Sequence, residues 1–239
     1  MLKKLFCCCG SRNDENREEQ TTEEKIVDDF GNETVIIRRV VTTRTIETKG
    51  SKSGISKIVK SKKLVTSNYS PEIEFGELDG NRSLSPVSID EKKFRDECLK
   101  WHNHYRKKHG VPDLVLNSKI SAFAKEWAEK LAKSNRFDHR PNNSYGENIY
   151  FASSTNPAFV ITGKDPVESW YKEISAHKFG KEPTNLSSGH FTQVIWKESK
   201  ELGVGIGRNG NNFIVVANYS PAGNVIGRFA ENVPPPKAR

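Results

Sequence analysis

Opposite charge blocks occupy the first part of this 239-residue chain and constrain where a folded core can form. Residues 13–33 contain nine acidic and two basic side chains, whereas residues 35–63 contain nine basic and one acidic. Segments of this composition rarely bury enough apolar surface to offset the conformational entropy that folding removes. We therefore expect a disordered, charge-segregated linker over residues 13–87. One folded domain should follow over residues 88–236, with a short tail at 237–239.

Two stretches of that linker leave alternatives open. Residues 35–43 are rich in valine, isoleucine and threonine, so they could pair as a β-hairpin or aggregate. Residues 55–65 mix lysines with aliphatic side chains and could either touch an acidic membrane or remain a solvated linker.

Helical signals open the expected domain. Ser88 and Glu91 have the spacing of a capping box, and apolar residues then recur at helical spacing to about residue 109. Asn117 is a suitable cap for a second helix with a similar apolar stripe. Asp165, followed by a proline, predicts the start of a third helix.

Strand signals dominate the last part of the chain. Residues 202–206 and 213–219 are apolar runs on either side of an Asn-Gly-Asn-Asn sequence, which is a strong hairpin signal. Helices combined with antiparallel strands in one domain predict the α+β class.

A set of four titratable side chains forms the candidate site. His190 lies in the apolar run from Gly189 to Trp196, directly after a Ser/Gly loop, and His139, Glu147 and Glu173 also neighbour aromatic or glycine residues. Two neutral imidazoles and two carboxylates suit a borderline cation such as Zn²⁺. The same set could hold an anion through histidine protonation near pH 6, or could only form hydrogen bonds across a cleft.

The cysteines leave the expected domain without an internal disulfide. Cys98 has no second cysteine in the C-terminal part of the chain, so no disulfide can form within the expected domain. The other three, Cys7, Cys8 and Cys9, are adjacent and cannot cross-link a domain.

The first 12 residues predict a membrane anchor. Two lysines and two apolar residues precede the three adjacent cysteines, and S-acylation of those thiols would supply the lipid. Leu2 excludes N-myristoylation, which requires glycine at that position. We expect no secretory signal, because the apolar run from Leu5 to Cys9 is far shorter than the hydrophobic core of a signal peptide.

Four stretches, in this order, resemble signatures of the CAP superfamily (cysteine-rich secretory proteins, antigen 5 and pathogenesis-related 1), in particular its Golgi-associated plant pathogenesis-related branch. They are His102-Asn-His-Tyr-Arg106, Gly146-Glu-Asn-Ile149, Gly189 to Trp196 and Val215 to Val225. The resemblance covers about residues 90–236. It implies an α-β-α sandwich.

The resemblance also implies roles for individual residues. The family's cleft tetrad falls on His139, Glu147, Glu173 and His190. Secreted members carry several disulfides and have a cysteine where this chain has Ala217, and this departure favours a reducing compartment. Structural roles are implied for the remaining motif residues, which are His102, Tyr105, Arg106, Asn148, Trp196 and Tyr219.

These observations predict a non-enzymatic CAP-domain protein on the cytosolic face of the Golgi or plasma membrane. We expect it to bind acidic membrane lipids or a sterol in the central cleft, and to bind Zn²⁺ there weakly. A homodimer is one possible assembly, and no nucleic-acid partner is expected. One alternative is a metal-dependent peptidase or esterase that uses the tetrad, although the chain has neither His-Glu-x-x-His nor Gly-x-Ser-x-Gly. Another is a polyanion-binding module for sulfated glycans, because the net charge of +8 falls on the part after residue 90.

Overall fold

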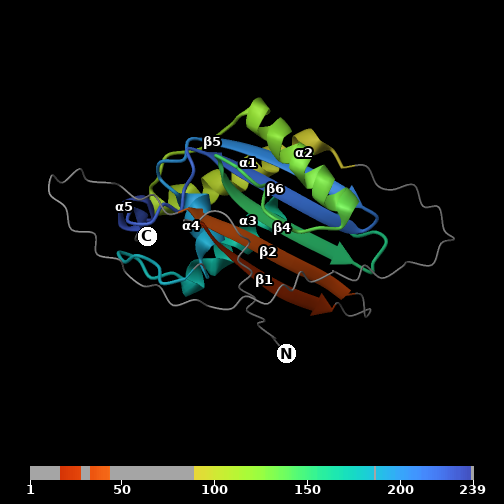
Figure 1. The fold of residues 1–239 in the computed structure, drawn as a ribbon, viewed down its shortest axis with the longest axis horizontal. Coiled ribbons are helices and arrows are strands. Elements are labelled where there is room, and N and C mark those ends of the chain that lie inside the picture. The colour runs from red at the N-terminus through yellow and green to blue at the C-terminus, as the bar shows by residue number, and fades with distance from the viewer. Residues whose placement is uncertain (1–16, 28–32, 44–88, 186, 238–239) are drawn as a thin grey trace, which may run out of the picture.

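The computed structural model describes residues 17–27, 33–43, 89–185 and 187–237. A six-stranded sheet lies between two layers of helices, with α2 on one face and α1, α3 and α4 on the other (Figure 1). The predicted α+β class and the α-β-α sandwich are therefore confirmed. The strands occur in the order β1-β2-β4-β6-β5-β3 and have these bounds: β1 Arg17–Val27, β2 Glu33–Thr43, β3 Val115–Leu116, β4 Gly146–Ser154, β5 Glu201–Asn209 and β6 Asn212–Ser220.

The helices begin and end largely where local sequence directs. Helix α2 starts after Asn117, whose side chain accepts from the amides of Lys119 and Ile120, as predicted. Gly110 ends α1 in the left-handed conformation, with φ of 68°. The bounds are α1 Glu91–His109, α2 Ser118–Ser134, α3 Lys164–Tyr171, a 3-10 helix η1 Lys172–Ala176, α4 Gly189–Ile195 and α5 Phe229–Asn232.

Two predicted helix starts are wrong in detail. Asp90, not Ser88, caps α1, because its carboxylate accepts from the Lys93 amide at 3.0 Å; Ser88 lies outside the described residues. Helix α3 begins at Lys164, and Asp165 instead accepts from the amide and hydroxyl of Thr162 just before the helix.

The structure also corrects the predicted linker. Residues 17–27 and 33–43 do not form a disordered arm: they are the antiparallel pair β1 and β2, which we call the N-terminal hairpin, and β2 pairs with β4. An isolated hairpin is marginal in water, but β4 offers an edge and Ile37 packs into the core beside α2. The hairpin alternative for residues 35–43 is thus confirmed. The rest of 13–87 and the anchor at 1–12 lie outside the described residues.

The apolar core fills both faces of the sheet. On the α1, α3 and α4 face, Trp170, Trp196 and Tyr219 are fully buried; on the α2 face, Ile149 and Val216 are fully buried. No helix among the residues that the structure describes is long and apolar enough to cross a membrane.

Candidate functional site

The first half of the site is a buried pair of His139 and Glu147. Glu147 is the second residue of β4, and His139 lies in the loop between α2 and β4. Nδ1 of His139 is 2.7 Å from Oε1 of Glu147, and the side chains are 0% and 2% exposed. The carboxylate also accepts from the Arg140 amide at 3.0 Å and from the side-chain amides of Asn143 at 2.9 Å and Asn218 at 3.0 Å. Four donors therefore hold Glu147 in place.

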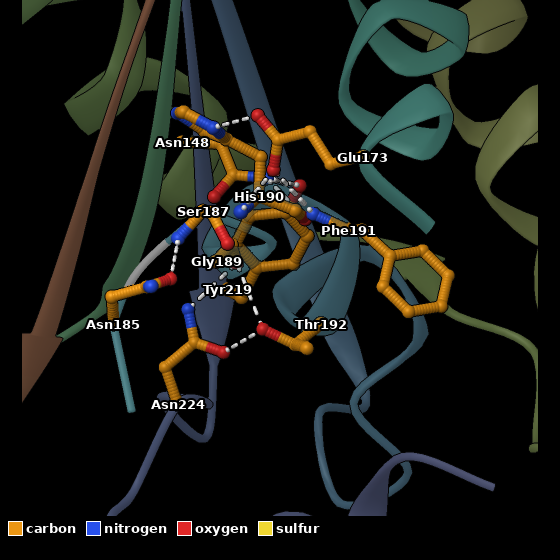
Figure 2. A network of polar contacts seen from close by, with 10 residues as sticks. All are labelled: Asn148, Glu173, Asn185, Ser187, Gly189, His190, Phe191, Thr192, Tyr219 and Asn224. Carbon is orange, nitrogen blue, oxygen red and sulfur yellow. Dashed lines mark hydrogen bonds and ion pairs between the residues drawn. The ribbon is translucent and has the colours of Figure 1, made fainter. Parts of the chain in front are cut away.

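The second half is the pair of Glu173 and His190. Glu173 lies in η1, and His190 lies in the first turn of α4, which sequence analysis treated only as an apolar run. Nδ1 of His190 is 2.8 Å from Oε1 of Glu173, while Oε2 accepts from the amides of His190 at 3.0 Å and Phe191 at 3.3 Å (Figure 2). The carboxylate thus satisfies the first amides of α4, where a negative charge is also favourable.

A buried polar chain connects the second pair to α1. Asn148 donates from its side-chain amide to the His190 carbonyl at 3.1 Å and to the Tyr219 hydroxyl at 3.2 Å (Figure 2). The Tyr219 hydroxyl lies 2.8 Å from Nε2 of His102, whose Nδ1 lies 2.8 Å from the Cys98 carbonyl. A carbonyl can only accept, so Nδ1 of His102 carries the proton and Nε2 accepts from Tyr219.

Burial sets the protonation of this chain of contacts. It lowers the pKa of His102 to about 4, so the ring is neutral at pH 7. Burial also raises the pKa of Tyr219 and of the Cys98 thiol well above their ordinary values. Cys98 is therefore a protonated thiol that donates to the Gly163 carbonyl, and it is no candidate nucleophile.

The other predicted motif residues support the framework around the pairs. The fully buried guanidinium of Arg106 donates to the backbone carbonyls of Pro112, Val194, Trp196 and Ser199. This ties the end of α1 to the segment that leaves α4. Separately, Tyr105 stacks on Tyr171 with ring centroids 3.7 Å apart, and Trp196 packs edge-on against Phe229.

Several residues that position the site were not predicted from the sequence. Asn143 and Asn218 donate to Glu147. The Thr192 hydroxyl of α4 donates to the side-chain oxygen of Asn224 at 2.6 Å (Figure 2). Asn224 also donates to the Gly189 carbonyl at 2.8 Å. Asn218 and Asn224 fall inside the last matched signature, which could have singled them out, whereas nothing in the local sequence marks Asn143.

The four predicted site residues come together as two pairs. Within the described ranges, no group of three or more His, Cys, Asp or Glu side chains is arranged to hold a metal ion. Each carboxylate faces the Nδ1 atom of its own histidine, so a metal could be bound only through Nε2 of either ring. Nε2 of His190 is buried and has no hydrogen-bond partner among the residues described. In many metal sites a carboxylate contacts the ring nitrogen opposite the metal-binding one and so orients the imidazole, and this geometry fits that arrangement. Zinc binding itself stays a prediction.

A candidate serine nucleophile is Ser188, which lies beside His177. Ser188, which is 3% exposed, lies just before α4 with Oγ 3.0 Å from Nδ1 of His177. Burial lowers the pKa of His177, so the imidazole is neutral and could accept the serine proton. The low exposure of Ser188 limits its access to any substrate.

Comparison with known proteins agrees with the fold and the motifs. The family model of the cysteine-rich secretory protein (CAP) family matches residues 99–219. Over 153 residues the chain is 42% identical to "Golgi-associated plant pathogenesis-related protein 1" of Homo sapiens, covering 61% of this chain and 96% of that protein. It is 32% identical over 145 residues to "Protein PRY2" of Saccharomyces cerevisiae, covering 59% of this chain and 41% of that protein.

A solved structure shows the same fold. The structure described as "Crystal structure of NaASP2 with Zn2+" aligns with a TM-score of 0.50 at 22% identity, covering 61% of this chain and 87% of that one. The folded part, its motifs and these matches lead to one conclusion: the chain belongs to the CAP (cysteine-rich secretory protein) family.

Proposed function

We propose that this chain is a non-enzymatic CAP module that binds peripherally to the cytosolic face of the Golgi or plasma membrane. S-acylated Cys7, Cys8 and Cys9 anchor it, and a lipid or sterol binds near the two His–Glu pairs. The human relative is named as Golgi-associated, which supports this compartment. The three adjacent thiols beside Lys3 and Lys4 support the anchor.

One observation carries the non-enzymatic assignment: the donors around both carboxylates. Glu147 accepts from four groups and Glu173 from three. A general base needs a lone pair directed at a substrate proton. The oxygens of these glutamates are directed at imidazole and amide donors of the protein itself. They therefore act as positioning groups for His139 and His190.

Weak zinc binding fits the same geometry. His139 and His190 would be the ligands through Nε2, with Glu147 and Glu173 holding the opposite side of each ring. Two imidazoles are fewer than the three protein ligands of a typical catalytic zinc site, so weak affinity is expected. The fold relative solved with Zn²⁺ supports the type of ion.

Membrane flotation of cell lysates tests the anchor. The wild-type chain should float with membranes and be released by hydroxylamine, which cleaves thioesters. The variant with Cys7, Cys8 and Cys9 all changed to serine should remain in the soluble fraction. Cys98→Ser is the matched control, because this thiol is buried in the folded domain and should not affect flotation. Persistent flotation of the triple variant would refute acyl anchoring.

The hydrolase alternative has its own test. The neutral His177 beside Ser188 is the observation that favours it. Purified wild type should show no cleavage of peptide or fatty-acyl ester substrates, with or without Zn²⁺. Cleavage that disappears in Ser188→Ala or His190→Ala would establish the hydrolase in place of the proposed function.

A further inference from the structure

The strand register places the start of β1 at the same end of the sheet as the candidate site. Arg17 of β1 pairs with Thr43 of β2, and Val40 of β2 pairs with Asn148 of β4. Glu147 is the neighbour of Asn148, and α4 lies against β2. In Figure 1 the arrows of β1 and β4 point the same way, away from α4. We call this end, where β1 and β4 start, the site end.

The opposite end of the sheet is equally well defined. The turn between β5 and β6 lies there, because Asn212 pairs with Ser153 near the end of β4. The end of α2 lies there as well, because Asn209 donates to the Ala132 carbonyl at 3.3 Å. We call this the far end.

The N-terminal hairpin is held on the β4 edge by main-chain pairing and by burial. Residues 34–40 pair with residues 148–154, and the Glu33 amide donates to the Thr155 hydroxyl at 2.9 Å. Ile37 is 9% exposed, and it lies opposite Phe151 in the core beside α2. Burial of an isoleucine side chain stabilises the docked hairpin, so a polar substitution at this position should weaken the docking.

Docking of the hairpin changes the length of chain between the cysteines and the folded domain. From Cys9 to Arg17 there are only eight residue steps, which reach roughly 30 Å at most. If the hairpin were undocked, the connection would run from Cys9 to Ile89. The end-to-end distance of a flexible coil of that length averages about 50 Å, and its maximum is far longer. The docked hairpin therefore determines how far the domain can move from an anchored N-terminus.

We propose that the N-terminal hairpin converts the N-terminal anchor into a short leash that holds the site end of the sheet toward a lipid bilayer. This rests on the proposed anchoring at the cysteines. The surface that faces the lipid is the end where β1 and β4 start. Residues 17–27 contain four glutamates and two basic residues, so β1 itself is not attracted to an acidic membrane. The short connection to the anchor supplies the orientation.

Energy transfer to the membrane measures the orientation. The full chain is coupled through its N-terminal cysteines to maleimide lipids in phosphatidylcholine vesicles that also contain a rhodamine lipid; Cys98 is only 1% exposed and should not react. A donor dye is attached to p-azidophenylalanine at exposed Ser144, near the site end, or at exposed Lys133, near the far end. The nine residues of β4 span roughly 30 Å, so transfer should be at least about twofold higher from position 144.

Two variants separate the leash from mere attachment. Ile37→Lys should undock the hairpin and remove the difference between the two dye positions. Val27→Lys changes the same hairpin at a position that is 57% exposed, and the difference should persist. An insert of about 40 Gly/Ser residues between Ser11 and Arg12 should leave the hairpin docked, lengthen the leash and remove the difference.

The outcomes distinguish this inference from the proposed function. Equal transfer from both positions in the wild-type chain, or higher transfer from position 133, would overturn the leash. A difference that persists in Ile37→Lys would do the same. The maleimide attachment does not depend on cellular S-acylation, so a failed flotation test with preserved orientation would count against the anchor alone.

Discussion

At the residue scale, the two histidine–glutamate pairs are the groups most open to direct test. Each imidazole has one nitrogen fixed by a carboxylate, which determines the atom it can offer to a metal. The carboxylates also accept hydrogen bonds from nearby backbone amides. Exchanging Glu for Gln alters the hydrogen bonding to the histidine with little change in the size of the side chain.

For zinc, we expect isothermal titration calorimetry to show weak binding to wild type and none to a variant with both His139→Ala and His190→Ala. Glu173→Gln should lower the affinity by about 10–100-fold, because the carboxylate orients the His190 ring. His104→Ala, at an exposed histidine of α1, is the matched control. Circular dichroism should show that each variant is folded. Absence of zinc heat from wild type would mean that the four residues only form hydrogen bonds.

For His102, we expect stability to fall in acid. The pKa is about 4 in the folded state and 6.5 in the reference state, so the unfolded chain binds the proton more readily. Stability from the neutral ring is therefore complete above pH 6.5 and is lost as pH falls toward 4, a decrease of roughly 3 kcal/mol in the free energy of unfolding.

Urea unfolding from pH 7.5 to pH 4.5 measures this effect. His102→Gln cannot titrate at this position and should show a smaller decrease than wild type. Burial also lowers the pKa values of His104, His109 and His177, so part of the decrease will remain in the variant. Parallel curves for wild type and His102→Gln would show that this ring does not contribute.

At the element scale, the N-terminal hairpin is an addition to the edge of the CAP sheet. The human relative is covered over 96% of its length by an alignment that uses 61% of this chain, and the family match lies at residues 99–219. That 61% is too small a share of this chain to include both residues 99–219 and the N-terminal hairpin. The core around α1 to α4 draws mainly on residues after 89, so it should form without the hairpin.

Deletion of residues 1–88 should accordingly leave a folded but less stable domain. The deletion exposes the β4 edge and removes the contacts of Ile37, so the free energy of unfolding should fall by about 1–3 kcal/mol. Urea unfolding with circular dichroism measures the loss. Deletion of residues 1–12 is the matched control, since it retains both strands, and it should leave stability unchanged. A truncated chain as stable as the control would mean that the hairpin contributes nothing to the domain.

At the scale of the whole molecule, the fold brings distant segments to one end of the sheet. The loop before β4 supplies His139, η1 supplies Glu173 and α4 supplies His190, while the start of β1 lies at the same end. Arg17 and the candidate site thus lie at the same end of the sheet although more than 100 residues separate Arg17 from His139.

Local signals and family motifs in the sequence determined the class, the cap at Asn117, the β5–β6 hairpin and the four candidate site residues. These features depend on neighbouring residues or on spacing, which a sequence displays directly. Only the tertiary structure decided that the hairpin docks on β4, because its charged composition argues against folding alone and the stabilising edge comes from residues over 100 positions away. The division of the tetrad into two pairs was likewise decided by the packing of β4, η1 and α4, since hydrogen-bond partners depend on distances that sequence spacing does not specify.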